Sequence, residues 1–200
     1  MKRYLVFGIL FVMGLFSLNA QGFYFDIGLG IGGAWTKING ADVANSFSSG
    51  GIDFKEVGVE FGLKAGGRIA NIPLYIVGVF GGLGHRLYSS LNQADYIQFN
   101  SYLIGPGVIF YPIPLIQLAG NIGFSYVSNQ TSLPGYMYES LGGLGGDISV
   151  AVDLGRGNHG CLIGLKYSLA VNILETSGAE INSSVLCGFV RYTFRHKVKN

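Results

Sequence analysis

Apolar and polar residues alternate one by one along most of this 200-residue chain. Between residues 23 and 31 every odd position is apolar: Phe23, Phe25, Ile27, Leu29 and Ile31. The even positions between them hold small or polar residues. Successive side chains of a β-strand point to opposite faces, so a period of two predicts a strand with one apolar face.

The same alternation returns seven more times, at residues 56–66, 75–82, 96–111, 116–126, 147–154, 161–173 and 186–194. The connections alternate in length, with short turns at 70–73, 112–114 and 155–159 and longer polar loops at 36–52, 86–95, 128–140 and 174–182. Within the fourth strand, Gly105-Pro106-Gly107 predicts a β-bulge, because proline cannot donate to a sheet ladder. Eight strands joined in this way predict an antiparallel up-and-down sheet.

Composition places this sheet in a membrane. The chain is 49% hydrophobic and 12% charged, whereas a soluble domain carries about 25% charged residues. After the start of the chain, no apolar run reaches the ~18 residues of a spanning helix. In lipid every backbone polar group must be paired within the protein, which leaves an all-β, closed transmembrane barrel. A soluble β-sandwich is the alternative, but its outward face would be polar, whereas here the polar face is rich in glycine.

The first twenty residues predict export. Lys2 and Arg3 form a basic start, residues 4–16 are apolar throughout, and a plausible cleavage region ends at Ala20. This is the pattern of a secretory signal peptide. We expect a signal peptide (1–20), a transmembrane barrel (21–194) and a short basic tail (195–200). The expected location is the outer membrane of a diderm bacterium, with both mature termini in the periplasm.

Aromatic residues gather near both ends of the predicted strands, as the two interfacial girdles of a membrane barrel require. Near the outer ends lie Trp35, Tyr88, Tyr96, Phe99 and Tyr126. Near the inner ends lie Phe23, Phe25, Tyr75, Tyr111, Tyr192 and Phe194. We expect these residues to lie at the level of the lipid headgroups.

Charged residues occur on the polar faces of the strands, which would line the barrel interior. Four are acidic and four are basic: Asp26, Glu60, Asp147 and Asp153 against Lys64, Arg68, Lys166 and Arg191. Barrel closure should bring Asp26 and Arg191 to the same height, with Lys64 near that level. Buried charges are costly unless they are paired, so we expect a balanced network that plugs the lumen. A water-filled conducting pore is the alternative.

Candidate enzyme motifs lack their structural context. Gly28, Gly30 and Gly33 have the spacing of a dinucleotide fingerprint, but the polar residues after Trp35 offer no helix to hold a pyrophosphate. A serine hydrolase needs a histidine beside its serine. No serine lies at near spacing on the same strand face as any of the three histidines, which are His85, His159 and His196. We therefore expect solvated histidines and no enzyme.

The two cysteines, Cys161 and Cys187, are expected on neighbouring strands, about nine residues or ~30 Å apart along them. We expect no disulfide between them, although export would permit one. The sequence contains no cluster with metal-ligand spacing, so no metal or other cofactor is predicted.

The longer loops are the candidates for contact with a partner. Tyr136, Met137 and Tyr138 form an aromatic group of the kind enriched in recognition surfaces. The alternative is that these residues sit among lipid headgroups as part of a girdle. The formal net charge of +2 gives no reason to expect a nucleic-acid partner.

The final strand, Gly188-Phe189-Val190-Arg191-Tyr192-Thr193-Phe194, is similar to the last strand of the small eight-stranded outer-membrane barrels of the OmpA, OmpX and OmpW kind. The resemblance covers residues 21–194 by pattern. It implies recognition of the last strand by the barrel assembly machinery, although six residues follow the aromatic here. It also implies a structural or surface-interacting, adhesin-like role, in contact with outer-membrane lipid and with an extracellular or host ligand at the loops. The alternative is a narrow OmpW-like channel for small or hydrophobic solutes.

Overall fold

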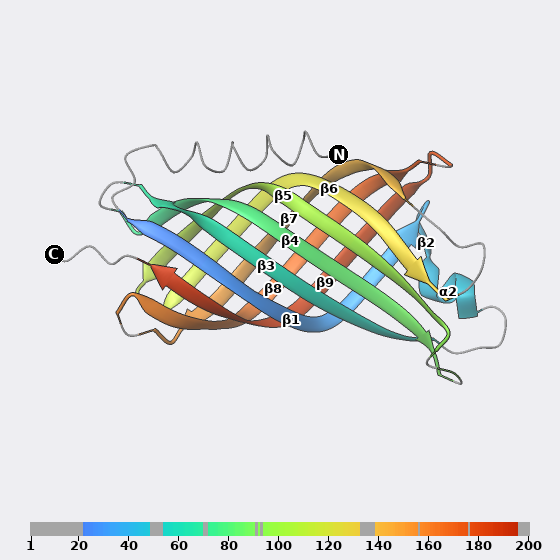
Figure 1. Cartoon of the computed structure of the whole chain (residues 1–200), viewed down its shortest axis with the longest axis horizontal. Helices are drawn as coiled ribbons and strands as arrows, with labels where there is room; N and C mark the ends of the chain where they lie inside the picture. Colours follow the sequence, from blue (N-terminus) through green and yellow to red (C-terminus); the bar gives the residue numbers. More distant parts are fainter. Residues whose placement is uncertain are drawn as a thin grey trace.

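A computed structural model shows an all-β barrel of eight long antiparallel strands (Figure 1). The structure describes residues 22–48, 54–69, 72–90, 92, 94–132, 139–155, 157–175 and 177–195. The strands are β1 (Phe23–Ile38), β3 (Phe54–Arg68), β4 (Leu74–Ser89), β5 (Tyr96–Ile113), β6 (Ile116–Thr131), β7 (Ser140–Asp153), β8 (His159–Leu174) and β9 (Glu180–Arg195). The predicted fold class is confirmed, whereas the predicted signal peptide lies outside the described residues. In the described part of the chain, no helix is long and apolar enough to cross a membrane.

The sheet closes because β9 pairs with β1, from Tyr24↔Arg195 to Ile38↔Ile181. Ladder partners can be followed once around the barrel: Ala34, Val185, Ser168, Asp147, Asn121, Gly107, Val77, Gly66 and Tyr24. The circuit returns to β1 ten residues below its start (34 − 24 = 10). With ~3.3 Å per residue and ~4.8 Å between strands, this displacement corresponds to a strand tilt of about 40°. Eight strands at such a tilt enclose a space that side chains alone can fill.

The alternation of the sequence becomes two faces of the barrel wall. Every long strand exposes at least one large apolar side chain on the outside: Leu29 (67%), Val59 (46%), Phe80 (43%), Val108 (51%), Ile122 (64%), Ile148 (67%), Leu165 (59%) and Val190 (54%). The opposite positions face the interior and are buried. The barrel thus has an apolar outside, the reverse of a soluble sandwich.

The strands are longer than the sequence predicted. We define the turn end as the end where β1 starts and β9 stops, and the loop end as the other (Figure 1). At the loop end β1 reaches Ile38, β4 reaches Ser89 and β6 reaches Thr131. The sequence did not predict these extensions, because the last residues of these strands are mostly polar and show no apolar alternation. β7 starts at Ser140 rather than at 147, and the sequence did not show this because glycines at 142, 143, 145 and 146 hide the alternation.

The predicted bulge at Gly105-Pro106-Gly107 is wrong. β5 keeps one register with β6 from Ile104↔Phe124 to Gly107↔Asn121, and the shift occurs between Phe110 and Ile113. Pro106 stays in register with Gly78 of β4. Gly105 lies so close to β6 that a Cβ atom there would approach the Cα of Gly123 to 2.5 Å. These residues therefore mark a close approach of two strands.

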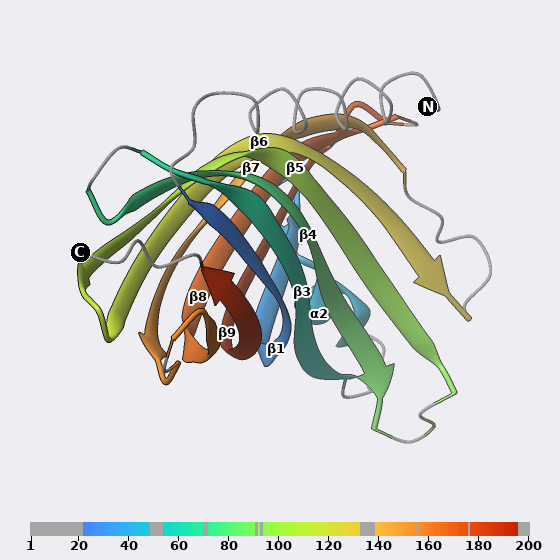
Figure 2. The ribbon, with the colours of Figure 1, turned by 60° about the vertical axis from the view of Figure 1, so that its left-hand side comes forward.

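The first predicted loop is partly ordered and folds over the loop end. Asn39 (φ 49°) and Gly40 (φ 81°) form a tight turn with two positive φ angles. The turn leads into β2 (Ala41–Asp42) and α2 (Val43–Ser48) at the loop end (Figure 1), and Figure 2 shows α2 behind β3. The Asp42 carboxylate accepts the Ala44 amide at 2.9 Å and so caps this short helix. Val43 is 3% exposed and packs among inward side chains of the barrel.

Candidate functional site

Five charged side chains meet in the middle of the barrel interior. Lys166 Nζ lies 2.9 Å from Glu60 Oε1 and 2.7 Å from Asp147 Oδ2. Arg191 donates to the same Glu60 oxygen and also lies 3.5 Å from Asp26 Oδ1. All five side chains are buried. The strands β1, β3, β7, β8 and β9 each contribute one of them, so barrel closure assembles this cluster from distant parts of the sequence.

Lys64 completes the charge balance of this layer. It is the ladder partner of Asp26 and is 1% exposed, but none of the ion pairs among the described residues includes it. Asp26 and Arg191 meet although their ladder positions differ by two residues, since Asp26 pairs with Thr193 and Gly28 with Arg191. The central layer, which we define as Asp26, Glu60, Lys64, Asp147, Lys166 and Arg191, holds three acids and three bases.

The other two predicted network residues lie at the turn end, away from the central layer. Asp153 Oδ2 is 3.0 Å from Arg195 Nη2, and Arg195 also donates to Pro114 O at 3.1 Å. Arg195 was expected in the tail, but it is the last residue of β9 and points inward. Arg68 Nε donates to Ile72 O at 2.8 Å, so it holds the β3–β4 turn.

A tyrosine cluster fills the interior between the central layer and the turn end. Tyr24 donates to Asp26 Oδ2 at 2.8 Å, and Gln117 Nε2 donates to the hydroxyls of Tyr24 and Tyr111, both at 2.8 Å. Tyr75 packs against Tyr24 with ring centroids 5.2 Å apart. Tyr75 (4% exposed) and Tyr111 (3%) were expected in the inner girdle, and that prediction is wrong.

The girdle prediction also fails for Phe99, which is 1% exposed and belongs to an apolar cluster at the loop end. The members of this cluster are Val43, Leu87, Ile97, Phe99, Val127, Leu174 and Ile181. On β4, Ile76 and Phe80 are exposed, which places the odd positions of this strand, Tyr75 among them, inside the barrel. The interior of β4 and β5 is apolar, so both faces look alike in the sequence.

His85 is buried, contrary to the expectation that it would be solvated. Its Nδ1 lies 2.8 Å from Thr36 Oγ1, and its Nε2 lies 3.6 Å from Glu56 Oε2. These side chains join β1, β3 and β4 just beyond Gly32↔Gly58, where the β1–β3 ladder ends. The order of hydroxyl, imidazole and carboxylate is that of a hydrolase triad, but Thr36 is 1% exposed and a substrate could not reach it.

Within the described ranges, the other histidine and the two cysteines do not come together. His159 is exposed with its Nδ1 2.6 Å from Tyr192 Oη, and His196 lies outside the described residues. Cys161 and Cys187 are free thiols. Cys187 pairs with Lys166 rather than with a residue near 170, so the thiols are five residues apart, about 17 Å along the strand. Among the residues that the structure describes, no group of three or more possible metal ligands comes together.

Comparison with known proteins supports the fold. No family model and no curated protein matches the chain. The structure of Ail, the attachment invasion locus protein of Yersinia pestis, is similar with 14% identity, covering 86% of this chain and 99% of that one at a TM-score of 0.53. That Ail structure contains the heparin analogue sucrose octasulfate. Two further similar structures have lower TM-scores. Neisserial surface protein A is 17% identical, with 84% of this chain and 95% of that one covered at a TM-score of 0.49. OprG from Pseudomonas aeruginosa is 14% identical, with 89% of this chain and 97% of that one covered at a TM-score of 0.48.

The closed sheet of eight long strands and its similarity to the Ail structure define a class: the chain has the fold of the small eight-stranded outer-membrane β-barrels. The identity to Ail is too low to show more than this fold. What the barrel does must therefore be argued from its own interior and surface.

Proposed function

We propose that this protein is an integral outer-membrane barrel with a structural or surface-interacting role and a plugged lumen. The apolar outside of all eight strands supports membrane insertion, because lipid accepts such a surface and water does not. The similarity of the fold to outer-membrane barrels supports the same location. The connections at the turn end are 69–73, 114–115 and 154–158, whereas three of the four at the loop end, 39–53, 90–95 and 132–139, are longer, which supports periplasmic termini.

The observation that carries the plugged lumen is the sequence of layers along its axis. From the turn end these are the tyrosine cluster, the central layer and the apolar cluster with Val43 of α2. The central layer is balanced in sign, and every member except Lys64 takes part in an ion pair, so the layer carries no net charge that would select ions. A cavity of about 10 Å³ beside Ser125, Lys166 and Ser168 has room for about one water molecule.

Conductance of purified protein in planar bilayers tests this proposal. We expect the natural protein to be silent. Replacing the Asp147–Lys166 pair with two alanines should open a path, because it removes two interior side chains without leaving a net charge. The outward pair Leu165→Ala and Val190→Ala is the matched control and should stay silent. Steady channels from the natural protein would overturn the plugged lumen.

One observation favours the alternative of a narrow channel for small or hydrophobic solutes. Ser168 and Ser183 present buried hydroxyl oxygens with no hydrogen-bond partner among the described residues. Water along the lumen would satisfy such groups. Uptake of small solutes into proteoliposomes, compared with the empty vesicles, separates the two functions.

We place the proposed surface interaction at the loop end, where the charged residues indicate which charge a partner can carry. Its described cations are Lys37, Lys55 and Arg86, and its described carboxylates are Asp42, Glu56, Asp95, Glu139, Glu175 and Glu180. Three cations against six carboxylates favour a neutral or cationic partner. We therefore expect sucrose octasulfate, the ligand in the Ail structure, not to bind in calorimetry.

Tyr136, Met137 and Tyr138 lie outside the described residues and remain our proposed contact. Adhesion of bacteria displaying the protein to mammalian cell monolayers tests this part. Tyr136→Ala together with Tyr138→Ala should reduce adhesion, and Tyr102→Ala, on the outer wall, is the control. Equal adhesion by vector-only cells would overturn the interaction. We propose no catalytic role, because Thr36 is enclosed.

A further inference from the structure

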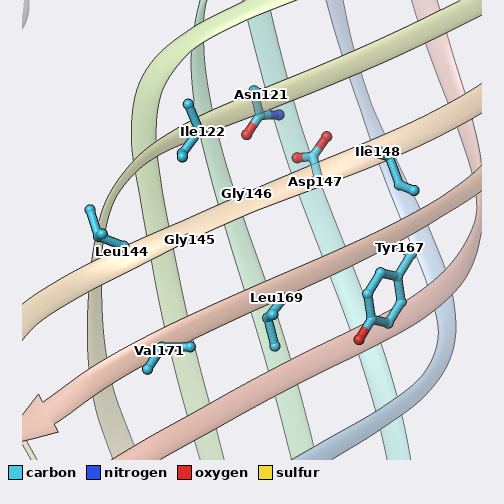
Figure 3. A pocket seen from close by; sticks show the side chains of 10 residues that line it. All are labelled: Asn121, Ile122, Leu144, Gly145, Gly146, Asp147, Ile148, Tyr167, Leu169 and Val171. Carbon is cyan, nitrogen blue, oxygen red and sulfur yellow. The ribbon is translucent and has the colours of Figure 1, made fainter.

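The outer wall and the loop end offer two kinds of surface to a ligand. On the outer wall, an apolar groove of about 450 Å³ crosses β6, β7 and β8, and Figure 3 shows its lining side chains. Its walls include Ile122 (64% exposed), Leu144 (67%) and Ile148 (67%), which lipid chains cover without a specific contact in the membrane proposed above. Polar atoms that could bind a ligand lie instead inside the loop end, on His85 and Glu56.

His85 presents a buried nitrogen to Glu56. The His85 side chain is 3% exposed, and its Nε2 atom has no hydrogen-bond partner among the residues that the structure describes. Glu56 Oε2 lies 3.6 Å away, which is too long for a hydrogen bond, since N–H···O bonds span about 2.7–3.2 Å. A buried polar atom without a partner is costly. The position between Nε2 and Oε2 therefore suits a small ligand that bonds to both atoms.

The separation of these two atoms is that of two ligands on one metal ion. Zn–N bonds of about 2.0–2.1 Å and Zn–O bonds of about 2.0–2.2 Å, at angles of about 109–120°, place the ligand atoms about 3.3–3.7 Å apart. Glu56 lies diagonally across the β3–β4 ladder from His85, because His85 pairs with Gly58 and Glu56 pairs with Leu87. The residue directly opposite His85 is thus a glycine, which puts no side chain of its own beside the imidazole.

Thr36 holds the other nitrogen of the imidazole. Its Oγ1 lies 2.8 Å from His85 Nδ1, and Thr36 is 1% exposed. Assigned to Nδ1, the ring proton donates to this hydroxyl and leaves the Nε2 lone pair for a metal. A hydrogen bond at the second nitrogen is the usual way in which a protein orients a metal-binding histidine.

An ion can reach the pair from the side of Glu56. The side chain of Glu56 is 29% exposed, two residues from the loop end of β3. Asp42 of β2 is near enough to interact electrostatically with both His85 and Glu56, which adds negative charge to the surroundings. The position is therefore accessible and attractive to a cation.

The described cations of the loop end do not compete for this position. Lys37, Lys55 and Arg86 each stand next to one of the three site residues in the sequence. Neighbouring side chains of a strand point to opposite faces, so these cations point outward. The inward face of this end is left with carboxylates and a neutral imidazole.

We propose that His85 Nε2 and a carboxylate oxygen of Glu56 bind a divalent transition-metal ion, with Zn²⁺ as the representative. Water completes the coordination, because no third protein ligand joins the two among the described residues. Imidazole with carboxylate suits Zn²⁺, whereas Ca²⁺ requires six to eight oxygen ligands. The site goes beyond the proposed membrane role. Sequence spacing did not predict it, because its ligands lie on different strands.

Calorimetric titration of Zn²⁺ into the purified protein in detergent micelles tests the site. We expect one bound ion that depends on His85, so His85→Gln should abolish its binding and Glu56→Gln should weaken it. His159→Gln and His196→Gln remove the other two histidines and should keep this ion. Migration of unboiled and boiled samples on a gel shows whether each variant is folded, and Glu56→Gln, at the exposed rim, tests the site even where His85→Gln does not fold.

Thr36→Val separates positioning from packing. It keeps the shape of the side chain and removes the hydroxyl, and we expect Zn²⁺ affinity to fall about tenfold, as when a metal-bound histidine loses its second hydrogen bond. Co²⁺ in place of Zn²⁺ gives a visible absorption spectrum that reports nitrogen coordination and should be lost in His85→Gln. No Zn²⁺ uptake by the natural protein, uptake unchanged in folded His85→Gln, or equal affinity for Ca²⁺ would each overturn the proposed site.

Discussion

The interior of this barrel has two walls of opposite character. On β1, β3, β7, β8 and β9 the inward positions at mid-height carry the six charges of the central layer. On β4 and β5 the inward positions at similar distances from the turn end are apolar: Val77, Val79, Leu83, Leu103 and Ile109. One wall is held by ion pairs, and the other by packing of side chains.

The two walls respond to different physical demands. Charges taken out of water must be paired, so each member of the charged wall depends on its partners across the lumen. Apolar side chains need only volume and close contact, so each depends on its immediate neighbours. Loss of one residue should therefore be costlier on the charged wall, where an unpaired charge stays behind.

Arg191→Met should give the largest effect. It removes the cation that contacts both Glu60 and Asp26, and breaking a buried ion pair costs about 3–5 kcal/mol of unfolding free energy. Urea unfolding of the barrel in lipid vesicles measures the change. Arg86→Met is the control, because Arg86 lies outside over the Tyr96 ring and should cost far less. Equal costs for the two variants would mean that the charged wall is bathed in water.

Ile109→Ala tests the apolar wall. Ile109 is fully buried in the cluster with Tyr24 and Val77, and removing such a side chain costs about 2–4 kcal/mol through lost burial and the remaining cavity. Its neighbour Val108 points outward, is 51% exposed, and serves as the control in Val108→Ala. The same unfolding assay applies. A cost near zero at Ile109 would show that this wall is not packed.

The two walls also explain how much of the fold the sequence could predict. On β1, β8 and β9 a charged or small inward face contrasts with an apolar outward face, so strand, facing and topology were correct. On β4 and β5 both faces are apolar, and the interior residues Tyr75, Phe99 and Tyr111 were assigned to the membrane girdles. Alternation reveals a strand's faces only where those faces differ.

The interior contacts were predictable only in part. The alternation of the strands predicted that the charged residues face the interior. It did not predict their height along the barrel axis, which depends on the position of each residue along its strand, and Arg68 and Asp153 lie at the turn end. The contact of Thr36, His85 and Glu56 depends on where the β1–β3 ladder ends, which no local pattern encodes. The pairing of Asp153 with Arg195 depends on the length of the last strand.

A double-mutant cycle separates pairing from packing within the charged wall. Asp147 and Lys166 lie 2.7 Å apart, and their coupling free energy should be about 1–3 kcal/mol when measured with Asp147→Asn and Lys166→Met. Asp26 and Arg191, at 3.5 Å, should couple less strongly but by more than about 1 kcal/mol. Additive effects within ~0.3 kcal/mol for both pairs would show that these charges are screened by lumen water.

Tyr111→Phe should give the smallest effect, because it changes a polar contact at the point where the two walls meet. It removes the hydroxyl that accepts a hydrogen bond from Gln117 Nε2 but keeps the ring that packs against Tyr75 and under Arg195. Gln117 retains its bond to Tyr24, so the loss should be about 0.5–1.5 kcal/mol, the contribution of one hydrogen bond. Tyr102→Phe, on the outward face of the same strand, is the matched control and should leave the unfolding free energy unchanged. A loss at Tyr111 as large as that of Arg191→Met would mean that the tyrosine cluster and the central layer form one cooperative network, and that the walls are not energetically distinct.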